Sequence, residues 1–394
     1  MTKRNTRLSA AAVLLFLALA PLAAFAGDGK ISFAGSIKNE SGFLSFHEAA
    51  PYTVPDAAAS DWYSRTSARA AVSGESETTA FRAEAWSAFD HAGGTWSISL
   101  DEAWGEWKPH RSFSARLGRA RLAFGPCLAF SPANSFTTKD VFDDRANKAE
   151  LDGITAKFIP LAAFGLYDSP VAISVDASLF LPSGPLAAMP TAPADLDESN
   201  AFARLALYLP GAGILGPTEI GLCGDARRIG VGNGSSESST EGLRPCAAGA
   251  WLSMDVAGFV VGAEGAVRTP EYDSSAATNT AVSAGTDDVE AECAFGVNRK
   301  IGDLFCVVEA DYSTVKSEWT AFARIAWTGD DLDLSFSAMT DASTGSTRAG
   351  FEADYTASDS LVIGFAGTGN YLPEKWDYFL PVGLTAAASL EFFF

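Results

Sequence analysis

The chain has 394 residues, of which 28 are Lys or Arg and 48 are Asp or Glu, so its formal net charge is −20 at pH 7. This acidity argues against nucleic acid as a partner, because nucleic-acid-binding proteins carry clustered basic residues. The 3 histidines and 5 cysteines match no catalytic or metal-binding spacing. We therefore expect a protein that is not an enzyme and that has no cofactor or metal. A hydrolase assembled from residues far apart in the chain is the alternative.

Residues 1–26 have the three parts of a secretory signal peptide. Basic residues begin the segment, an apolar core follows, and Ala24-Phe25-Ala26 has the small residues of a cleavage site. Cleavage before Gly27 leaves residues 27–394 as the mature domain, and a retained membrane anchor is the alternative. No later uncharged apolar run approaches the ~18 to 20 residues that a membrane helix needs. We therefore expect an exported protein without membrane-spanning helices.

Almost the whole of 27–394 alternates between apolar and polar side chains. In "VAISVDASLFL" (171–181), every second residue from Val171 to Leu181 is apolar, while Asp176 lies on the other face. This period is typical of a β-strand with one apolar and one polar face. Segments of about ten residues match the length of a tilted strand that crosses a bilayer. We predict about eighteen strands, with sixteen as the alternative, beginning near Ile31, Ser64, Ala80, Trp96, Phe113, Ile154, Val171, Phe202, Glu219, Ala248, Phe259, Val289, Leu304, Trp319, Leu332, Arg348, Leu361 and Leu384.

The connections between these strands alternate between short and long. The short ones are 73–77, 256–258, 300–303, 328–331 and 357–359, and the long ones include 182–199, 230–244, 269–287 and 370–381. A transmembrane barrel has tight turns at one end and long loops at the other, and an even strand count places both termini at the short-turn end. One short turn lies between Cys293 and Cys306, which either face each other across that hairpin or act as small apolar filler.

Two features favour a membrane barrel over a large soluble β-sandwich or propeller. Charges occupy one face of strand after strand, whereas a soluble core needs tightly packed large apolar residues. Aromatic residues also lie near strand ends, as in the interfacial girdles of membrane barrels. They are Trp62, Tyr63, Trp96, Trp107, Trp251, Trp319, Trp327, Tyr371 and Trp376.

The last strand ends on three phenylalanines. In "LTAAASLEFFF" (384–394), Leu390, Phe392 and Phe394 share the apolar face. With the signal peptide and the alternation over 30–394, this ending resembles that of a bacterial outer-membrane β-barrel of the porin type. The resemblance implies an all-β, antiparallel, up-and-down transmembrane barrel. It also implies that Phe394, Phe392 and Leu390 act as the signal read by the barrel-assembly machinery.

The same resemblance implies a location and a function. The barrel would sit in outer-membrane lipid and form a water-filled channel for passive diffusion of small hydrophilic solutes or ions. Homo-oligomers are implied as well, because trimers are common among porins. A surface adhesin or structural protein is the alternative, although its loops would be longer than the roughly twenty-five residues seen here, and an outer-membrane hydrolase is another.

The polar faces of the strands would line the lumen with opposed charges. Strands near the amino terminus contribute Arg65, Arg69, Arg82, Glu84 and Arg116, and later strands contribute Glu290, Glu292, Glu309, Asp311, Glu352 and Asp354. A narrow passage that is basic on one side and acidic on the other orients dipolar solutes and filters ions. Alternatively, these residues only keep a wide lumen hydrated.

The stretch 116–144 resembles a porin segment in which an Arg-rich strand runs into a loop with "FSP" and an acidic residue. This likeness implies that the loop around 125–150, after the fifth strand, folds inward and narrows the pore. Strict alternation from Leu117 would turn Arg119 and Arg121 toward lipid, where an arginine costs about 2 to 4 kcal/mol at the midplane.

A β-bulge at Gly118 would turn both arginines inward, because one extra residue inverts all later side chains. The predicted constriction then consists of Arg116, Arg119, Arg121, Asp140, Asp143 and Asp144. In the alternative, Arg119 and Arg121 lie at the external rim, where they bind water or lipid headgroups.

Overall fold

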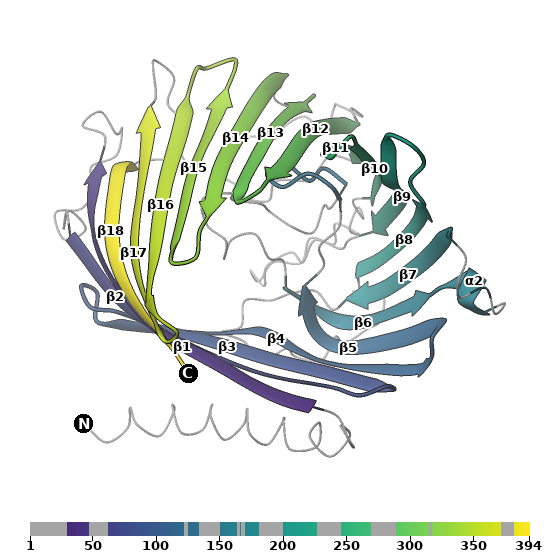
Figure 1. The fold of residues 1–394 in the computed structure, drawn as a ribbon, viewed down its shortest axis with the longest axis horizontal. Helices are drawn as coiled ribbons and strands as arrows, with labels where there is room; N and C mark the ends of the chain where they lie inside the picture. The colour runs from purple at the N-terminus through teal and green to yellow at the C-terminus, as the bar shows by residue number, and fades with distance from the viewer. Residues whose placement is uncertain are drawn as a thin grey trace, which may run out of the picture.

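The computed structural model describes residues 30–46, 62–121, 125–133, 150–163, 166, 170–180, 200–226, 246–268, 289–314, 317–371 and 382–394. The predicted signal peptide, 1–26, lies outside these residues. Strands follow one another around a ring (Figure 1): β1 (Lys30–Phe46), β2 (Trp62–Glu75), β3 (Thr79–Asp90), β4 (Thr95–His110), β5 (Phe113–Arg121), β6 (Glu150–Phe158), β7 (Ala172–Phe180), β8 (Asn200–Leu209), β9 (Leu215–Ala226), β10 (Cys246–Val256), β11 (Phe259–Arg268), β12 (Glu290–Ile301), β13 (Leu304–Ser313), β14 (Glu318–Thr328), β15 (Leu332–Asp341), β16 (Thr347–Ser358), β17 (Leu361–Tyr371) and β18 (Val382–Phe393).

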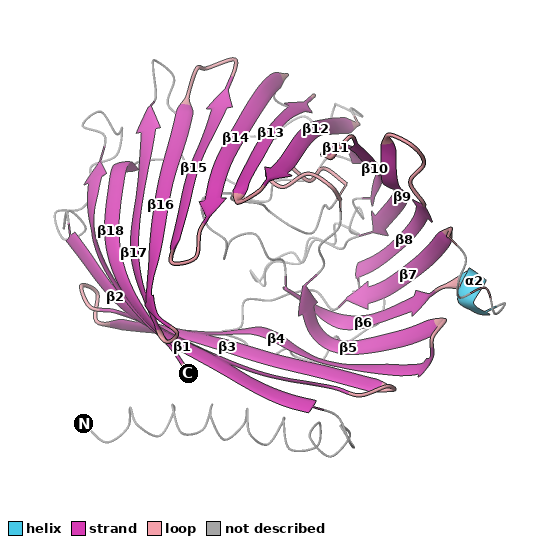
Figure 2. Ribbon diagram, viewed as in Figure 1, coloured by secondary structure: helices cyan, strands magenta, loops and turns pink. Residues whose placement is uncertain are grey.

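The sheet is closed. Each strand pairs antiparallel with the next, and β1 also pairs with β18, from Ser36 opposite Phe393 to Phe46 opposite Val382. The prediction of an all-β, up-and-down barrel with 18 strands is confirmed, and the alternative of sixteen is wrong. In the described part of the chain, the one helix is α2 (Pro160–Ala163), between β6 and β7 (Figure 2). No described helix is long and apolar enough to cross a membrane.

The alternation of apolar and polar residues predicted the starts of the strands well. Every predicted start lies within four residues of the observed one, because a two-residue period is a local property of the chain. The lengths were underestimated for the first strands, since β1 has 17 residues, β2 has 14 and β4 has 16.

The turns of two or three residues all lie at one end of the barrel, which we call the tight-turn end. Residues 257–258 join β10 to β11, and 302–303 join β12 to β13. Ala257 and Gly258 both have positive φ, 53° and 81°, as a type I′ hairpin turn requires. The longest separations, such as 181–199 and 227–245, lie at the other end. β1 starts and β18 ends at the tight-turn end.

Apolar side chains face outward and are exposed. Phe33 is 78% exposed, Leu117 63%, Val308 62% and Phe365 55%. On β18, Leu390, Phe392 and Phe394 belong to the same outer surface. A belt of this extent is unfavourable in water, and the hydrocarbon of a bilayer is its natural solvent.

Most of the predicted girdle residues are exposed near strand ends: Trp62, Trp96, Trp107, Trp319, Trp327 and Tyr371. Two predictions were wrong, because the register turns these residues inward. Tyr63 donates from its hydroxyl to Glu40 Oε1 at 3.0 Å, and Trp251 is 3% exposed and donates to Glu219 Oε1 at 2.9 Å. Trp376 lies outside the described residues.

Cys127, Cys223, Cys293 and Cys306 are free thiols. Cys293 lies opposite Tyr312 and Cys306 opposite Arg299, so the two do not face each other across their hairpin. Among the residues that the structure describes, no group of His, Cys, Asp or Glu is arranged to hold a metal ion.

Candidate pore constriction

Residues 125–133, which follow β5, lie inside the barrel against β11 and β13 (Figure 1, the blue segment beside β11 and β12). On β11, Glu264 lies on the face opposite the exposed Phe259 and Val267, and it is 3% exposed. Its Oε1 accepts the backbone N–H of Cys127 at 2.8 Å, and its Oε2 accepts the Ser131 hydroxyl at 3.2 Å. This carboxylate therefore binds the loop directly to the inner wall.

A second carboxylate binds three consecutive amides of the loop. Glu309, on the inner face of β13 and 2% exposed, accepts the N–H of Leu128 at 2.5 Å, of Ala129 at 2.7 Å and of Phe130 at 3.2 Å. Buried charge is tolerated when it is fully hydrogen-bonded, and successive backbone amides form a good anion site. Glu309 was predicted as a lumen-wall residue. It lies on the inner wall, but its carboxylate binds the loop.

Apolar side chains on the inner wall complete the contact. Ala129 packs in one cluster with Val307 and Phe322, and Ala133 packs in another with Phe202 and Trp251. These inward apolar residues break the simple rule of apolar outside and polar inside, because the loop covers them. The sequence analysis did not identify these residues as contacts of the loop. The signal available for this was the presence of bulky apolar residues on the inward faces of neighbouring strands.

The close approach of the loop to the inner wall also depends on two glycines of that wall. A Cβ atom at Gly262 would lie 2.8 Å from Pro126 Cβ, and one at Gly249 would lie 2.9 Å from Ala133 Cα. Nearby, the Arg268 guanidinium donates to the Pro132 carbonyl at 3.0 Å. The wall of β10 and β11 is thus shaped to receive the loop.

The wall formed by β2–β5 carries a ladder of ion pairs. Glu84 has a fully buried side chain and accepts Arg69 Nε and Arg82 NH2, each at 2.6 Å. Arg82 Nε lies 2.6 Å from Glu102 Oε2. Arg65 lies over the Trp86 ring, with 4.7 Å between the guanidinium carbon and the ring centroid.

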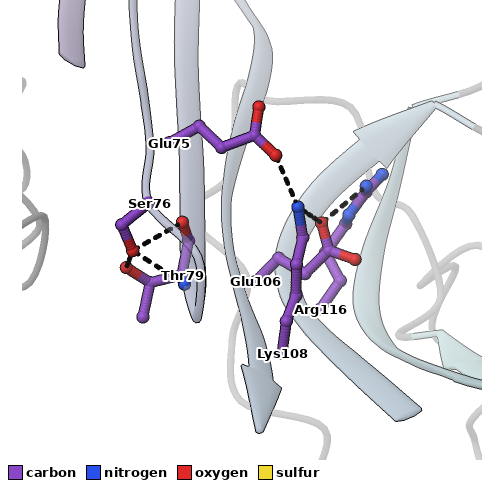
Figure 3. Close-up of polar contacts among 6 residues, drawn as sticks. All are labelled: Glu75, Ser76, Thr79, Glu106, Lys108 and Arg116. Carbon is purple, nitrogen blue, oxygen red and sulfur yellow. Dashed lines mark hydrogen bonds and ion pairs between the residues drawn. The ribbon is translucent and has the colours of Figure 1, made fainter. Parts of the chain in front are cut away.

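The ladder continues toward the tight-turn end (Figure 3). Lys108 Nζ lies 2.7 Å from Glu75 Oε1 and 3.9 Å from Glu106 Oε2, and Arg116 NH2 donates to the same Glu106 oxygen at 3.2 Å. Arg116 also lies over the Trp104 ring at 4.0 Å. Cations and carboxylates therefore alternate along this wall.

Neither a protein-family model nor a curated protein sequence matches the chain. Solved structures do. OccK2 (OpdF) of Pseudomonas aeruginosa matches 93% of this chain and 97% of its own, with a TM-score of 0.54 and 10% identity. OccD3 (OpdP) of the same organism matches 92% and 91%, with a TM-score of 0.51 and 10% identity. A triple mutant of the Rhodopseudomonas blastica porin covers 93% and 100%, with a TM-score of 0.44 and 11% identity.

The chain has the fold of a porin-type β-barrel. We predicted that one side of the lumen, formed by strands near the amino terminus, is basic. The structure of this porin-type barrel corrects that prediction. Each of Arg69, Arg82 and Arg116 is paired with a carboxylate on the adjoining strand, so the wall of β2–β5 is mixed in charge.

The opposite side of the lumen, formed by β12, β13 and β16, carries many acidic residues. The pairing of these strands shows which of their residues face inward. Glu290, Glu292, Asp311, Glu352 and Asp354 lie on the inward faces of β12, β13 and β16. Arg268 NH2 lies 3.1 Å from Glu292 Oε2, the Ser335 hydroxyl donates to Glu352 at 3.2 Å, and Asp354 stands directly opposite Asp333. Their effect on permeating ions stays a prediction.

The predicted bulge at Gly118 was wrong. Pairing of β5 with β4 and β6 runs through Gly118 without a shift, and Arg119 lies between Ala103 and Asp152. The extra residue is Asp101 on β4, since Glu84 pairs with Glu102 and Ala85 with Leu100.

Gly118 instead has a φ of +122°, and a Cβ there would lie 2.1 Å from the Ala103 carbonyl oxygen. Arg119 NH1 donates to the Leu100 carbonyl at 2.9 Å, next to the irregularity in β4. Arg119 and Arg116 therefore have different partners. The side chain of Arg121, and all of Asp140, Asp143 and Asp144, lie outside what the structure describes.

Proposed function

We propose that this barrel is an outer-membrane channel for passive diffusion of small hydrophilic solutes and ions. The observation that supports it best is the attachment of residues 125–133 to Glu264 and Glu309 inside the barrel. A loop held against one wall leaves passage along the other wall, which is the charged ladder of β2–β5. The constriction then lies between this loop and that ladder of ion pairs.

The acidic residues on β12–β16 suggest a preference for cations. Arg69 and Arg82 are each paired with a neighbouring carboxylate, whereas Asp333 and Asp354 face each other as like charges. A passage with excess negative charge attracts cations and repels anions. A net charge of −20 for the chain agrees with this direction.

Two other functions are less well supported. A barrel that serves only as a surface anchor has no need for a loop bound inside its lumen. A hydrolase needs a nucleophile and a base, and the Ser112 hydroxyl does lie 2.7 Å from His110 Nδ1. That ring nitrogen also accepts the Ser112 backbone N–H at 3.2 Å, and Ser112 is only 6% exposed, so the contact stabilises a turn.

Planar-bilayer recording tests the proposal. Folded protein, verified by a heat-modifiable band on electrophoresis, is expected to insert in discrete conductance steps that increase with salt concentration. In a salt gradient, the reversal potential is expected to have the sign of cation selectivity. Folded protein that inserts without conductance would instead support the anchor.

A further inference from the structure

A cavity of about 740 Å³ lies at the rim of the tight-turn end, between the β2–β3 turn and the β4–β5 connection. Its lining includes Lys108, His110, Arg111, Ser112, Ser114 and Lys157. This volume is within the range of sites that hold small molecules. The residues come from three consecutive hairpins, so the cavity belongs to the barrel wall and its rim.

The pairing of β4 with β5 is interrupted beside this cavity, and the cause lies in the local sequence. The register of β4 with β5 shifts between Trp107 and His110, where Pro109 has no N–H to donate. Lys108 N–H bonds sideways to the Thr78 carbonyl at 2.7 Å, and Ile159 N–H bonds to the Ser112 carbonyl at 2.8 Å. These bonds hold the walls of the cavity in place.

Its lining is rich in donors. Lys108 is held by Glu75 at 2.7 Å (Figure 3). Lys157 stands opposite Asp176 in register, yet Asp176 Oδ2 is bound by Arg204 at 2.9 and 2.8 Å. Within the described residues no carboxylate forms an ion pair with Lys157.

His110 contributes one N–H donor, at Nε2. Because the Ser112 N–H donates to Nδ1, the neutral imidazole carries its proton on Nε2. Ser114 supplies a hydroxyl group to the same lining, whereas the Ser112 hydroxyl is bound to His110 Nδ1 at 2.7 Å.

The fixed charges of the lining give a small positive excess. Lys108, Arg111 and Lys157 face Glu77 and Glu106, and Glu106 is also bound by Arg116. A carboxylate or phosphate group in the cavity would be attracted by this positive excess, and Lys157 could donate to it in a charge-assisted hydrogen bond.

We propose that this cavity is a binding site for a small water-soluble oxyanion, a carboxylate or phosphate group, at the tight-turn mouth of the barrel. The site depends on the proposed channel only for the route by which the anion arrives. It would hold the anion briefly at a mouth whose lumen otherwise repels negative charge.

The test measures binding without conductance. Inorganic phosphate is titrated into folded barrel in a phosphate-free detergent, and its ³¹P line broadening is followed; acetate is then added as a competitor. The variant is Arg111→Gln with Lys157→Gln, which leaves the ion pairs of Lys108 intact. The matched control is Lys300→Gln, an exposed lysine near the same end of the barrel but outside the cavity.

Saturable broadening is expected in the wild type, with displacement by acetate. In the double variant the affinity is expected to fall roughly tenfold, and in Lys300→Gln it is expected to be unchanged. Equal broadening in all three folded proteins, or none in the wild type, would overturn the site. Because conductance plays no part in the readout, such a failure would leave the proposed channel untouched.

Discussion

Phe394 and Gly35 exchange two backbone hydrogen bonds, each N–H donating to the other's carbonyl at 3.0 Å. The Phe394 ring lies over Gly35, where a Cβ atom would come within 2.6 Å of it. The last residue of the chain thus continues the β1–β18 pairing that closes the barrel. Its ring belongs to the outer surface, 75% exposed.

Replacing Phe394 by Ser is therefore expected to reduce the amount of folded barrel in the outer membrane. The ring is lost from the end of the outward apolar row that includes Leu390 and Phe392. Phe393→Ser is the matched control, because Phe393 lies opposite Ser36 on the other face. The heat-modifiable band should weaken for Phe394→Ser and stay close to wild type for Phe393→Ser; equal bands would contradict the role of the outward row.

Removing the Glu309 carboxylate is expected to release residues 125–133. In Glu309→Ala three loop amides lose their acceptor, and each amide that stays buried costs about 1 to 3 kcal/mol. We expect a larger single-channel conductance and more open-channel noise.

Glu352→Ala is the control for that variant, because Glu352 faces inward and accepts the Ser335 hydroxyl on a neighbouring strand. It should leave the noise unchanged. An unaltered conductance in folded Glu309→Ala would show that the loop does not narrow the passage.

Neutralising Arg82 is expected to increase cation preference. Arg82→Gln removes a cation shared by Glu84 and Glu102 and so adds negative charge to the wall. Reversal potentials in a salt gradient should move further toward the cation limit. Arg119→Gln is the comparison, since the Arg119 guanidinium donates to the Leu100 carbonyl. A larger shift for Arg119→Gln than for Arg82→Gln would place the constriction elsewhere.

The two ends of the barrel are expected to face opposite sides of the membrane. An epitope inserted within 230–244, between β9 and β10, should be detected on intact cells, because long loops of outer-membrane barrels are external. An epitope at 257–258 should be detected only after permeabilisation. The reverse pattern would invert the topology.

The sequence by itself determined the barrel and the face to which most residues belong, and it favoured eighteen strands over sixteen without deciding the number. Alternation has a two-residue period, so it is visible within any ten-residue segment, and the exposed apolar belt makes every strand display it. The same local reading identified Phe394 as the end of the outward row on β18.

Tertiary structure alone decided which residues meet. Glu309 binds amides about 180 residues earlier in the chain, and Arg69 and Arg82 share Glu84 because of how β2 and β3 are registered. Alternation predicts a face but not a partner. It could not show that Trp251 turns inward beneath Ala133, nor that the irregularity lies at Asp101 rather than Gly118. These choices depend on the shape of the neighbouring strand and loop, which is established only when the barrel closes.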